Sequence, residues 1–252
     1  MLDFLNAHRT LTQILFASLL LLMLIGAIFF AHKFEVTKTR SEKIKKYATV
    51  AIFSALSIGL YYLRIPFPVF TFLKMQLSSV PAYIVGFLLG PASGLMVIFI
   101  RTAICIPFTS TICVGELADL LIGTAATLTS SLYYLKNKTK TKAAISLTLA
   151  SVVWVLTAIL ANVVLLLPFY IRLMFNGNEV AFVNMLASSA SFINENNYVL
   201  MYVLVGVIPF NLMISIVSAV VTFLIYKRIS KLYRNIAKED NNSDLVEDLI
   251  DK

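Results

Sequence analysis

Residues 115–142 read GELADLLIGTAATLTSSLYYLKNKTKTK, an apolar run that ends in a strongly basic segment. The stretch from Gly115 to Leu135 has the length of a membrane-spanning helix, which needs about 20 mostly apolar residues. Lys136 to Lys142 then brings four lysines in seven residues. Because short loops rich in lysine and arginine stay on the cytoplasmic side of a membrane, this segment predicts a transmembrane helix whose carboxyl end faces the cytoplasm.

The composition of the whole chain is that of a membrane protein. Of its 252 residues, 59% are AVILMFWYC and 13% are DEKR, against roughly 45–50% and about 25% in ordinary soluble proteins. An ordinary soluble fold is therefore excluded. The apolar residues suffice for about seven spans of about 20 residues each, so we expect an all-α polytopic membrane protein.

Six further apolar segments complete this prediction of seven spans. The first is too long for the core of a signal peptide and is followed by His32 and Lys33, so we expect it to be retained. Another is too long for one span and is broken at Gly90-Pro91, which predicts two short helices in a tight hairpin. The segments are Leu11–Ala31, Tyr47–Leu63, the hairpin Pro81–Phe108, Ala144–Phe169 and Tyr198–Tyr226.

Three connecting or terminal segments are more polar. Pro66 and Pro68 disfavour a helix after the second span and predict a structured, extended loop up to Pro81. Residues 176–197 predict an external loop with one amphipathic turn. The acidic tail from Glu239 predicts a solvated, mobile segment of weak helical character.

The basic residues are divided unequally between the two sides of this topology. Sixteen of the 21 Lys and Arg residues fall in segments 33–46, 136–142 and 227–252, four fall on the opposite side, and Arg101 lies within a span. The positive-inside rule therefore predicts an outside amino terminus and an inside carboxyl terminus. The net charge of +8 then reflects orientation rather than a surface for nucleic acid. The four outer residues are Arg9, Arg64, Lys74 and Arg172.

Catalytic groups are scarce within the predicted spans. His8 and His32, the only histidines, flank the spans, which excludes a metal site of the intramembrane metalloprotease kind. Ser93 has no histidine or lysine partner of the serine-protease kind, and we find no P-loop pattern for ATP. We therefore expect no enzyme and no metal. Cys105 and Cys113 are compatible with a disulfide or with buried free thiols, the commoner state.

A few polar residues lie within the apolar segments, where a charge costs at least about 2.5–3.5 kcal/mol. Glu116 and Asp119 share a helix face, and Arg101 lies in the preceding helix, which favours an ion pair across the hairpin. Alternatively, Glu116 borders a cavity and accepts hydrogen bonds from ligand hydroxyls. Asn162, in the middle of an apolar run, is either a contact between helices or a ligand-binding amide.

Five motifs, in order, give the chain a resemblance to the S-components of energy-coupling factor vitamin transporters, and within them to the riboflavin-specific branch. The resemblance covers about residues 47–233. The motifs are Ile65-Pro66-Phe67-Pro68 with Leu73-Lys74-Met75-Gln76-Leu77-Ser78-Ser79-Val80-Pro81, Phe87-Leu88-Leu89-Gly90-Pro91-Ala92-Ser93-Gly94, Gly115-Glu116-Leu117-Ala118-Asp119-Leu120-Leu121-Ile122-Gly123, Asn162-Val163-Val164-Leu165-Leu166-Leu167-Pro168-Phe169-Tyr170, and Ile208-Pro209-Phe210-Asn211.

This resemblance implies a six-helix core that binds riboflavin or a related flavin such as FMN from outside, as a transported ligand and not a cofactor. Import would require a transmembrane coupling subunit and two cytoplasmic ATPases in the bacterial plasma membrane. Ala51 and Ala55, in a stripe of small residues, would contact the coupling subunit, unless the stripe packs against a core helix instead. The implied substrate-binding residues are Asn162 at the ring's imide edge, Gln76, Ser79 and Lys74 near the polyol chain, and Met75, Glu116 and Asn211.

Two departures from the family pattern bear on the ligand. The riboflavin branch typically has Asp-Phe-Ser-Asp where this chain has Gln76-Leu77-Ser78-Ser79, and often a lysine where this chain has Ile214. Loss of two carboxylates beside Lys74 lowers the repulsion of a flavin phosphate. Riboflavin, FMN and a different vitamin therefore all stay open.

The predicted organisation has three parts. Residues 1–46 form an additional transmembrane helix followed by a basic cytoplasmic linker, and this helix serves either as an anchor or as a contact with a partner helix. Residues 47–233 form the substrate-binding domain, and residues 234–252 form the tail. A self-sufficient secondary transporter is the alternative from another class, although the sequence shows no clear internal repeat of the kind common in that class.

Overall fold

The computed structural model describes residues 25–26, 29, 39–70, 73–108 and 114–250. The first complete helix, α3 (Arg40–Tyr62), begins within the basic linker, before the predicted span at Tyr47. Thr39 and Glu42 form a capping box, with the Thr39 hydroxyl accepting from the Glu42 amide at 3.2 Å and the Glu42 carboxylate accepting from the Thr39 amide at 3.3 Å. The predicted span Leu11–Ala31 lies outside the described residues, apart from residues 25, 26 and 29.

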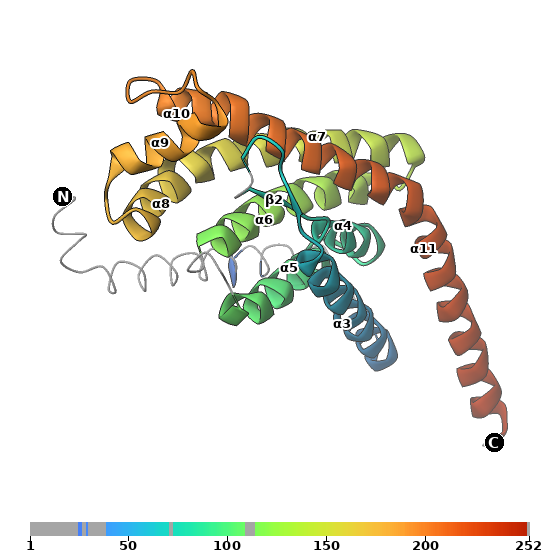
Figure 1. The fold of residues 1–252 in the computed structure, drawn as a ribbon. Helices are drawn as coiled ribbons and strands as arrows, with labels where there is room; N and C mark the ends of the chain where they lie inside the picture. Colours follow the sequence, from blue (N-terminus) through green and yellow to red (C-terminus); the bar gives the residue numbers. More distant parts are fainter. Residues whose placement is uncertain (1–24, 27–28, 30–38, 71–72, 109–113, 251–252) are drawn as a thin grey trace.

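The loop after α3 is extended, as its prolines predict. Strand β1 (Ile65–Pro66) pairs antiparallel with β2 (Lys74–Met75), with Ile65 opposite Met75 and Pro66 opposite Lys74. The loop carries buried aromatic residues, because Phe67 and Phe70 pack into the main core. This hairpin crosses in front of the helices in Figure 1.

The predicted helical hairpin is confirmed as α4 (Ser79–Leu88) and α5 (Pro91–Cys105), followed by the short 3-10 turn η1 (Ile106–Phe108). The break falls at Gly90, whose φ of 123° is strained for residues with a side chain, and Pro91 opens the next helix. Helix α4 begins at Ser79, before Pro81, because proline is tolerated in a first turn. Gly94 allows the two helices to approach closely: a Cβ there would lie 3.0 Å from the Ala82 carbonyl oxygen.

The next spans are long helices. Helix α6 (Val114–Lys136) and α7 (Lys140–Ala161) pack against each other across the basic loop, where Thr139 caps α7. The predicted span Ala144–Phe169 continues from α7 through a π-helical segment, η2 (Asn162–Leu166), into α8 (Leu167–Met174). Figure 1 shows these elements as a nearly continuous rod along the molecule.

The region before the last span differs from the prediction. Instead of one amphipathic turn, α9 (Glu179–Ser189) has 11 residues, is capped by Asn178, and buries Phe182, Val183 and Leu186. Burial of these three side chains against the core stabilises this helix. The polar residues around it are the reason that the sequence predicted a loop instead.

The last helix is longer than predicted. Helix α10 (Tyr198–Met201) passes through a second π-helical segment, η3 (Tyr202–Val207), into α11 (Ile208–Ile250). The tail is thus helical through Ile250, which corrects the expected weak helical character. In Figure 1 it projects from the bundle, on the side toward which the start of α3 also points.

Among the described residues, three helical stretches are long and apolar enough to cross a membrane: Pro91–Phe108, Lys140–Arg172 and Tyr198–Tyr233. The apolar α4 is shorter. The chain is therefore a mostly helical membrane protein. Its main core lies among α4, α6, α7, α9 and α11, under the β1–β2 loop, and includes Phe70, Phe87, Trp154, Phe182 and Tyr202.

Candidate ligand-binding site

A cavity of about 300 Å³ lies between α3, the β1–β2 loop, α6, α7, α8 and the last helix. Both π-helical segments border it, with Asn162 at the start of η2 and Val207 at the end of η3. Such segments insert one extra residue into a helix and are frequent at functional sites. The lining residues are Tyr61, Arg64, Leu73, Lys74, Gln76, Gly115, Glu116, Ala118, Asp119, Ile122, Trp154, Asn162, Leu166, Tyr170, Val207, Phe210, Asn211 and Ile214.

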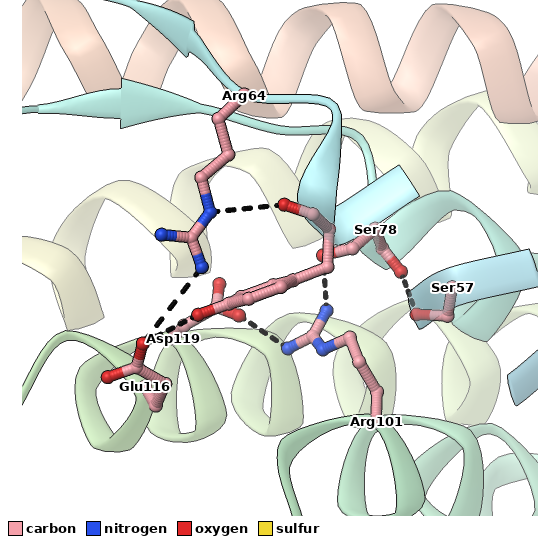
Figure 2. A network of polar contacts seen from close by, with 7 residues as sticks. Ser57, Arg64, Ser78, Arg101, Glu116 and Asp119 are labelled. Atoms are coloured by element: carbon pink, nitrogen blue, oxygen red, sulfur yellow. Dashed lines mark hydrogen bonds and ion pairs between the residues drawn. The ribbon is translucent and has the colours of Figure 1, made fainter. Parts of the chain in front are cut away.

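One side of the cavity, which we call the charged wall, consists of Tyr61, Arg64, Lys74, Gln76, Glu116 and Asp119. The Tyr61 hydroxyl donates to Glu116 at 2.7 Å, and an Arg64 nitrogen lies 4.0 Å from the same carboxylate oxygen. Arg64 also donates to the Tyr61 carbonyl at 3.2 Å and stacks its guanidinium 4.1 Å from the Tyr61 ring centre. Glu116 is thereby held at the cavity by the end of α3 (Figure 2).

Behind the charged wall lies Arg101, whose side chain is fully buried. Its guanidinium forms an ion pair with Asp119 and donates to the hydroxyl of Ser78, and the Ser57 hydroxyl donates to the Ser78 carbonyl. Figure 2 shows this second set of contacts, which joins Arg101 to Asp119 and Ser78 to Ser57. A buried charge of this kind requires an oppositely charged partner, so Asp119 and Arg101 stabilise one another.

A second group of lining residues, which we call the amide wall, consists of Asn162, Asn211, Trp154, Tyr170 and Phe210. Asn162 accepts a hydrogen bond from the Tyr202 hydroxyl at 2.9 Å and donates to the Ala158 carbonyl at 2.8 Å.

Asn211 belongs to a parallel arrangement on the same wall. It accepts from the Trp154 indole at 3.0 Å and donates to the Val207 carbonyl at 2.8 Å. These contacts fix both amides in orientation, and each amide retains hydrogen-bonding capacity, since its oxygen has two lone pairs and its nitrogen two protons.

Five of the seven residues predicted to bind substrate line the cavity: Lys74, Gln76, Glu116, Asn162 and Asn211. Met75 and Ser79 do not. Side chains alternate along an extended strand, so Met75 turns from the cavity and packs against the main core, while its two neighbours line the cavity. Ser79 is buried at the first residue of α4.

The ion pair predicted for Arg101 forms with Asp119. Glu116 instead contacts α3 and borders the cavity, so the two predictions for these acids apply to different residues. Asn162 was predicted to form either a contact between helices or part of a binding site. Its amide bonds to Tyr202, beyond α10, and it also lines the cavity.

Several lining residues carried no signal in the sequence. Tyr61, Trp154 and Tyr170 are aromatic residues within apolar helices, where the sequence does not distinguish a cavity wall from an ordinary core. Trp154 is the only tryptophan in the chain, and this rarity is the one feature of the sequence that could have indicated it. Phe210 lies in a motif already singled out, beside Asn211.

Ala51 and Ala55 lie away from the cavity, on the exposed face of α3. The buried face of the same helix carries Ser54, Ser57 and Tyr61. The stripe of small residues is therefore not used for packing against a described core helix.

The remaining candidate groups give no further site. Cys105 is buried, and Cys113 lies outside the described residues. Over residues 39–70, 73–108 and 114–250, no group of three or more His, Cys, Asp or Glu side chains is placed to hold a metal ion.

The sequence and the fold both match those of known membrane transport proteins. The family model for the substrate-specific component of ECF transporters matches residues 45–226. The chain is 28% identical over 201 residues to the riboflavin transporter RibU of Staphylococcus aureus (strain TCH60), covering 79% of this chain and 97% of the relative. It is 29% identical over 188 residues to the riboflavin transporter FmnP of Bacillus subtilis (strain 168), covering 73% and 91%.

A solved S component of a bacterial ECF transporter has a similar fold. It superposes with a TM-score of 0.60 at 24% sequence identity, over 75% of this chain and 98% of the solved one. At this identity the likeness concerns the fold alone.

Proposed function

Because the chain belongs to the family of substrate-specific components of ECF transporters, we propose that it captures riboflavin or a related flavin at the outer face of the cell membrane. Members of this family are substrate-binding subunits of transporters rather than enzymes. The names of the two riboflavin transporters that it resembles support a flavin as the ligand.

The observation that carries this proposal is the pairing of two different walls around one cavity. A flavin has a flat aromatic ring with an imide edge, and a flexible chain of hydroxyl groups. The amide wall offers aromatic surface with fixed amides, which suits the ring, while the charged wall offers many donors and acceptors, which suits the hydroxyls. The cavity volume of about 300 Å³ is at the lower end of the usual range for small-molecule sites.

Two cationic side chains on the charged wall leave FMN as a second candidate ligand. Arg64 and Lys74 both line the cavity, and Lys74 is exposed. A phosphate group at the end of the hydroxyl chain would be attracted by these charges. Competition between riboflavin and FMN for the purified chain discriminates between the two ligands.

Transport would require the shared module of the family, namely a transmembrane coupling subunit and two cytoplasmic ATPases. We propose that Ala51 and Ala55 form the contact with the coupling subunit. Their exposure supports this role, because small side chains allow a partner helix to approach closely.

The proposed topology has seven spans, with the amino terminus outside and the carboxyl terminus inside. It consists of six core spans from residue 47 onward and the additional span at Leu11–Ala31. The basic residues at the start of α3, between α6 and α7, and after Tyr226 support this orientation.

Binding of flavin to the purified full-length chain tests the proposal. Riboflavin fluorescence should be quenched on titration with the detergent-solubilised protein. Asn162→Leu should abolish the quenching, whereas the exposed loop substitution Asn196→Leu, which also exchanges an amide for an apolar group, should leave it unchanged. A fully folded chain that binds neither riboflavin nor FMN would overturn the flavin assignment.

Uptake by reconstituted vesicles tests the transport mechanism. Vesicles with the chain and the coupling module should accumulate riboflavin only with internal ATP. Substrate-driven uptake by the chain alone would instead favour the secondary transporter.

A further inference from the structure

The hydrogen bond between Tyr202 and Asn162 joins the two π-helical segments at their first residues. Asn162 begins η2, Tyr202 begins η3, and the Tyr202 hydroxyl donates to Oδ1 of Asn162 at 2.9 Å. Asn162 lines the cavity, whereas Tyr202 does not and is only 1% exposed. Tyr202 therefore contacts, from behind the cavity wall, a side chain that a ligand in the cavity can reach.

The hydrogen bonds of the Asn162 side chain fix which way its amide faces. Its Nδ2 atom donates to the Ala158 carbonyl at 2.8 Å. A backbone carbonyl only accepts hydrogen bonds, so the amide nitrogen must face Ala158 and the amide oxygen must face Tyr202. One proton on the nitrogen and one lone pair on the oxygen are then left for a ligand. Removal of the Tyr202 hydroxyl would leave the amide held at its nitrogen alone.

The ring of Tyr202 is itself held from two sides. Phe70 of the β1–β2 loop and Phe182 of α9 pack against it, with ring centres 6.1 Å and 6.3 Å away. Gly206, four residues further along η3, makes room for Phe70, since a Cβ there would lie 2.6 Å from the Phe70 ring. Packing by the loop and by α9 thus fixes the ring, and the ring fixes the place from which the hydroxyl donates.

The comparable bond on the same wall has a different character. Trp154 donates to Asn211 at 3.0 Å, but Trp154 itself lines the cavity. A substitution of Trp154 would therefore change the contacts of the ligand directly. Tyr202 lies outside the lining, so the effect of its hydroxyl on a ligand must pass through Asn162.

We propose that Tyr202 is a positioning residue for ligand binding, whose hydroxyl holds the Asn162 amide in the orientation that the ligand meets. This inference rests on the proposed function and extends it to a residue outside the cavity. A side chain that is already ordered before binding loses less conformational freedom when the ligand arrives. The hydroxyl of Tyr202 thereby raises affinity without touching the ligand.

The test measures dissociation constants for riboflavin by fluorescence quenching with the purified full-length chain. Tyr202→Phe keeps the ring and removes the hydroxyl, and it should raise the dissociation constant about tenfold, the worth of one good hydrogen bond. Tyr198→Phe is the matched control. Its ring lies one turn earlier, packs against the same Phe182 at 6.4 Å and does not line the cavity. The control should change the dissociation constant less than about twofold.

A second measurement separates positioning from a merely structural role. Melting temperatures are compared for the ligand-free chain, Tyr202→Phe, Asn162→Ala and the double variant. Because the hydroxyl acts on Asn162, Tyr202→Phe should lower the melting temperature more in the unsubstituted chain than in Asn162→Ala. A merely structural tyrosine would lower both equally and would leave the riboflavin affinity of the folded protein unchanged.

A further variant keeps the test decisive if Tyr202→Phe does not fold. Phe182→Leu retains the Tyr202 hydroxyl but removes one of the two rings that hold it. Since Phe182 does not line the cavity, its substitution should also act through Tyr202. We expect it to raise the riboflavin dissociation constant about threefold.

The outcomes distinguish this inference from the function it rests on. An unchanged riboflavin affinity in folded Tyr202→Phe, or in Phe182→Leu used in its place, would overturn the inference alone. An equal loss of affinity in Tyr198→Phe would do the same, because it would assign the effect to ring packing around Phe182. Equal losses of melting temperature in the two backgrounds would overturn it as well. Failure of the unsubstituted chain to bind either riboflavin or FMN would overturn the proposed function, and the inference with it.

Discussion

The hydroxyl of Tyr61 lies 2.7 Å from Oε1 of Glu116 and donates a buried hydrogen bond to it. This contact joins the end of α3 to the start of α6 at the charged wall of the cavity. Its position means that the helix with the exposed alanines also supports a residue that borders the cavity. Substitutions at Tyr61 can therefore report on the cavity and on α3 together.

We expect Tyr61→Phe to lower both stability and flavin affinity. The ring and its stacking with Arg64 are retained, but a buried hydrogen bond to a charged group, worth about 1.5–3 kcal/mol, is lost. Thermal unfolding in detergent and riboflavin titration measure the two effects. Tyr62→Phe at the exposed neighbouring position is the control and should shift stability by no more than about 0.5 kcal/mol. Equal effects at both positions would contradict the role of the Glu116 contact.

Asp119→Leu should strongly destabilise the protein, because it leaves the fully buried Arg101 guanidinium without its ion pair. Breaking a buried pair from one side costs about 3–5 kcal/mol. The double substitution Arg101→Met with Asp119→Leu removes both charges and should recover most of that loss. The fraction of monodisperse protein after detergent extraction and its melting temperature measure the recovery. A double variant less stable than Asp119→Leu would show that the pair is not the main interaction of Arg101.

Gly94→Ala should disrupt the α4–α5 hairpin. The added methyl group would lie 3.0 Å from the Ala82 carbonyl oxygen and 3.1 Å from the Gly86 Cα, and these backbone atoms cannot yield as a side chain can. We expect a loss of about 1–3 kcal/mol, as for other overpacked sites. Gly59→Ala is the matched control, since nothing lies within 4 Å of its added methyl group. The control should gain about 0.5–1 kcal/mol from its better helix propensity; a loss there would refute the packing explanation.

Ala51→Leu combined with Ala55→Leu should block assembly without affecting the ligand. Both positions are exposed on α3 and lie away from the cavity, so flavin titration of the isolated variant should match the unsubstituted chain. Co-purification with the coupling subunit and ATPases should be lost, because bulky side chains prevent close approach of helices. Ala144→Leu, an exposed alanine on α7, is the control and should retain the complex. Retention of the complex by the double variant would place the contact elsewhere.

The local features of the fold were predictable from individual sequence segments. The hairpin at Gly90-Pro91 and the extended loop with Pro66 and Pro68 depend on backbone restrictions that act within a few residues. The helix α9 was missed because it is stabilised by burial of Phe182 and Leu186 against distant elements, which a polar segment read by itself does not reveal.

The candidate site was predictable only in part. Polar residues in apolar segments, such as Asn162 and Glu116, attracted attention because they are costly there unless they have partners. The aromatic residues of the walls, such as Trp154 and Tyr170, look like any core residue in the sequence. The π-helical segments that border the cavity depend on a backbone hydrogen-bond pattern that the sequence did not predict.

The sequence by itself determined a mostly helical membrane protein, because hydrophobic length acts along the chain. The division of its charges between two sides stays a prediction from the positions of the lysines and arginines. Only the tertiary structure decided the roles of Glu116 and Asp119. These acids are three residues apart on one helix, and either could have paired with Arg101. Because α5 and the end of α3 pack against α6, Asp119 forms the ion pair with Arg101, while Glu116 accepts a hydrogen bond from Tyr61 and borders the cavity. Such choices depend on where neighbouring helices meet in space, which spacing along one helix does not specify.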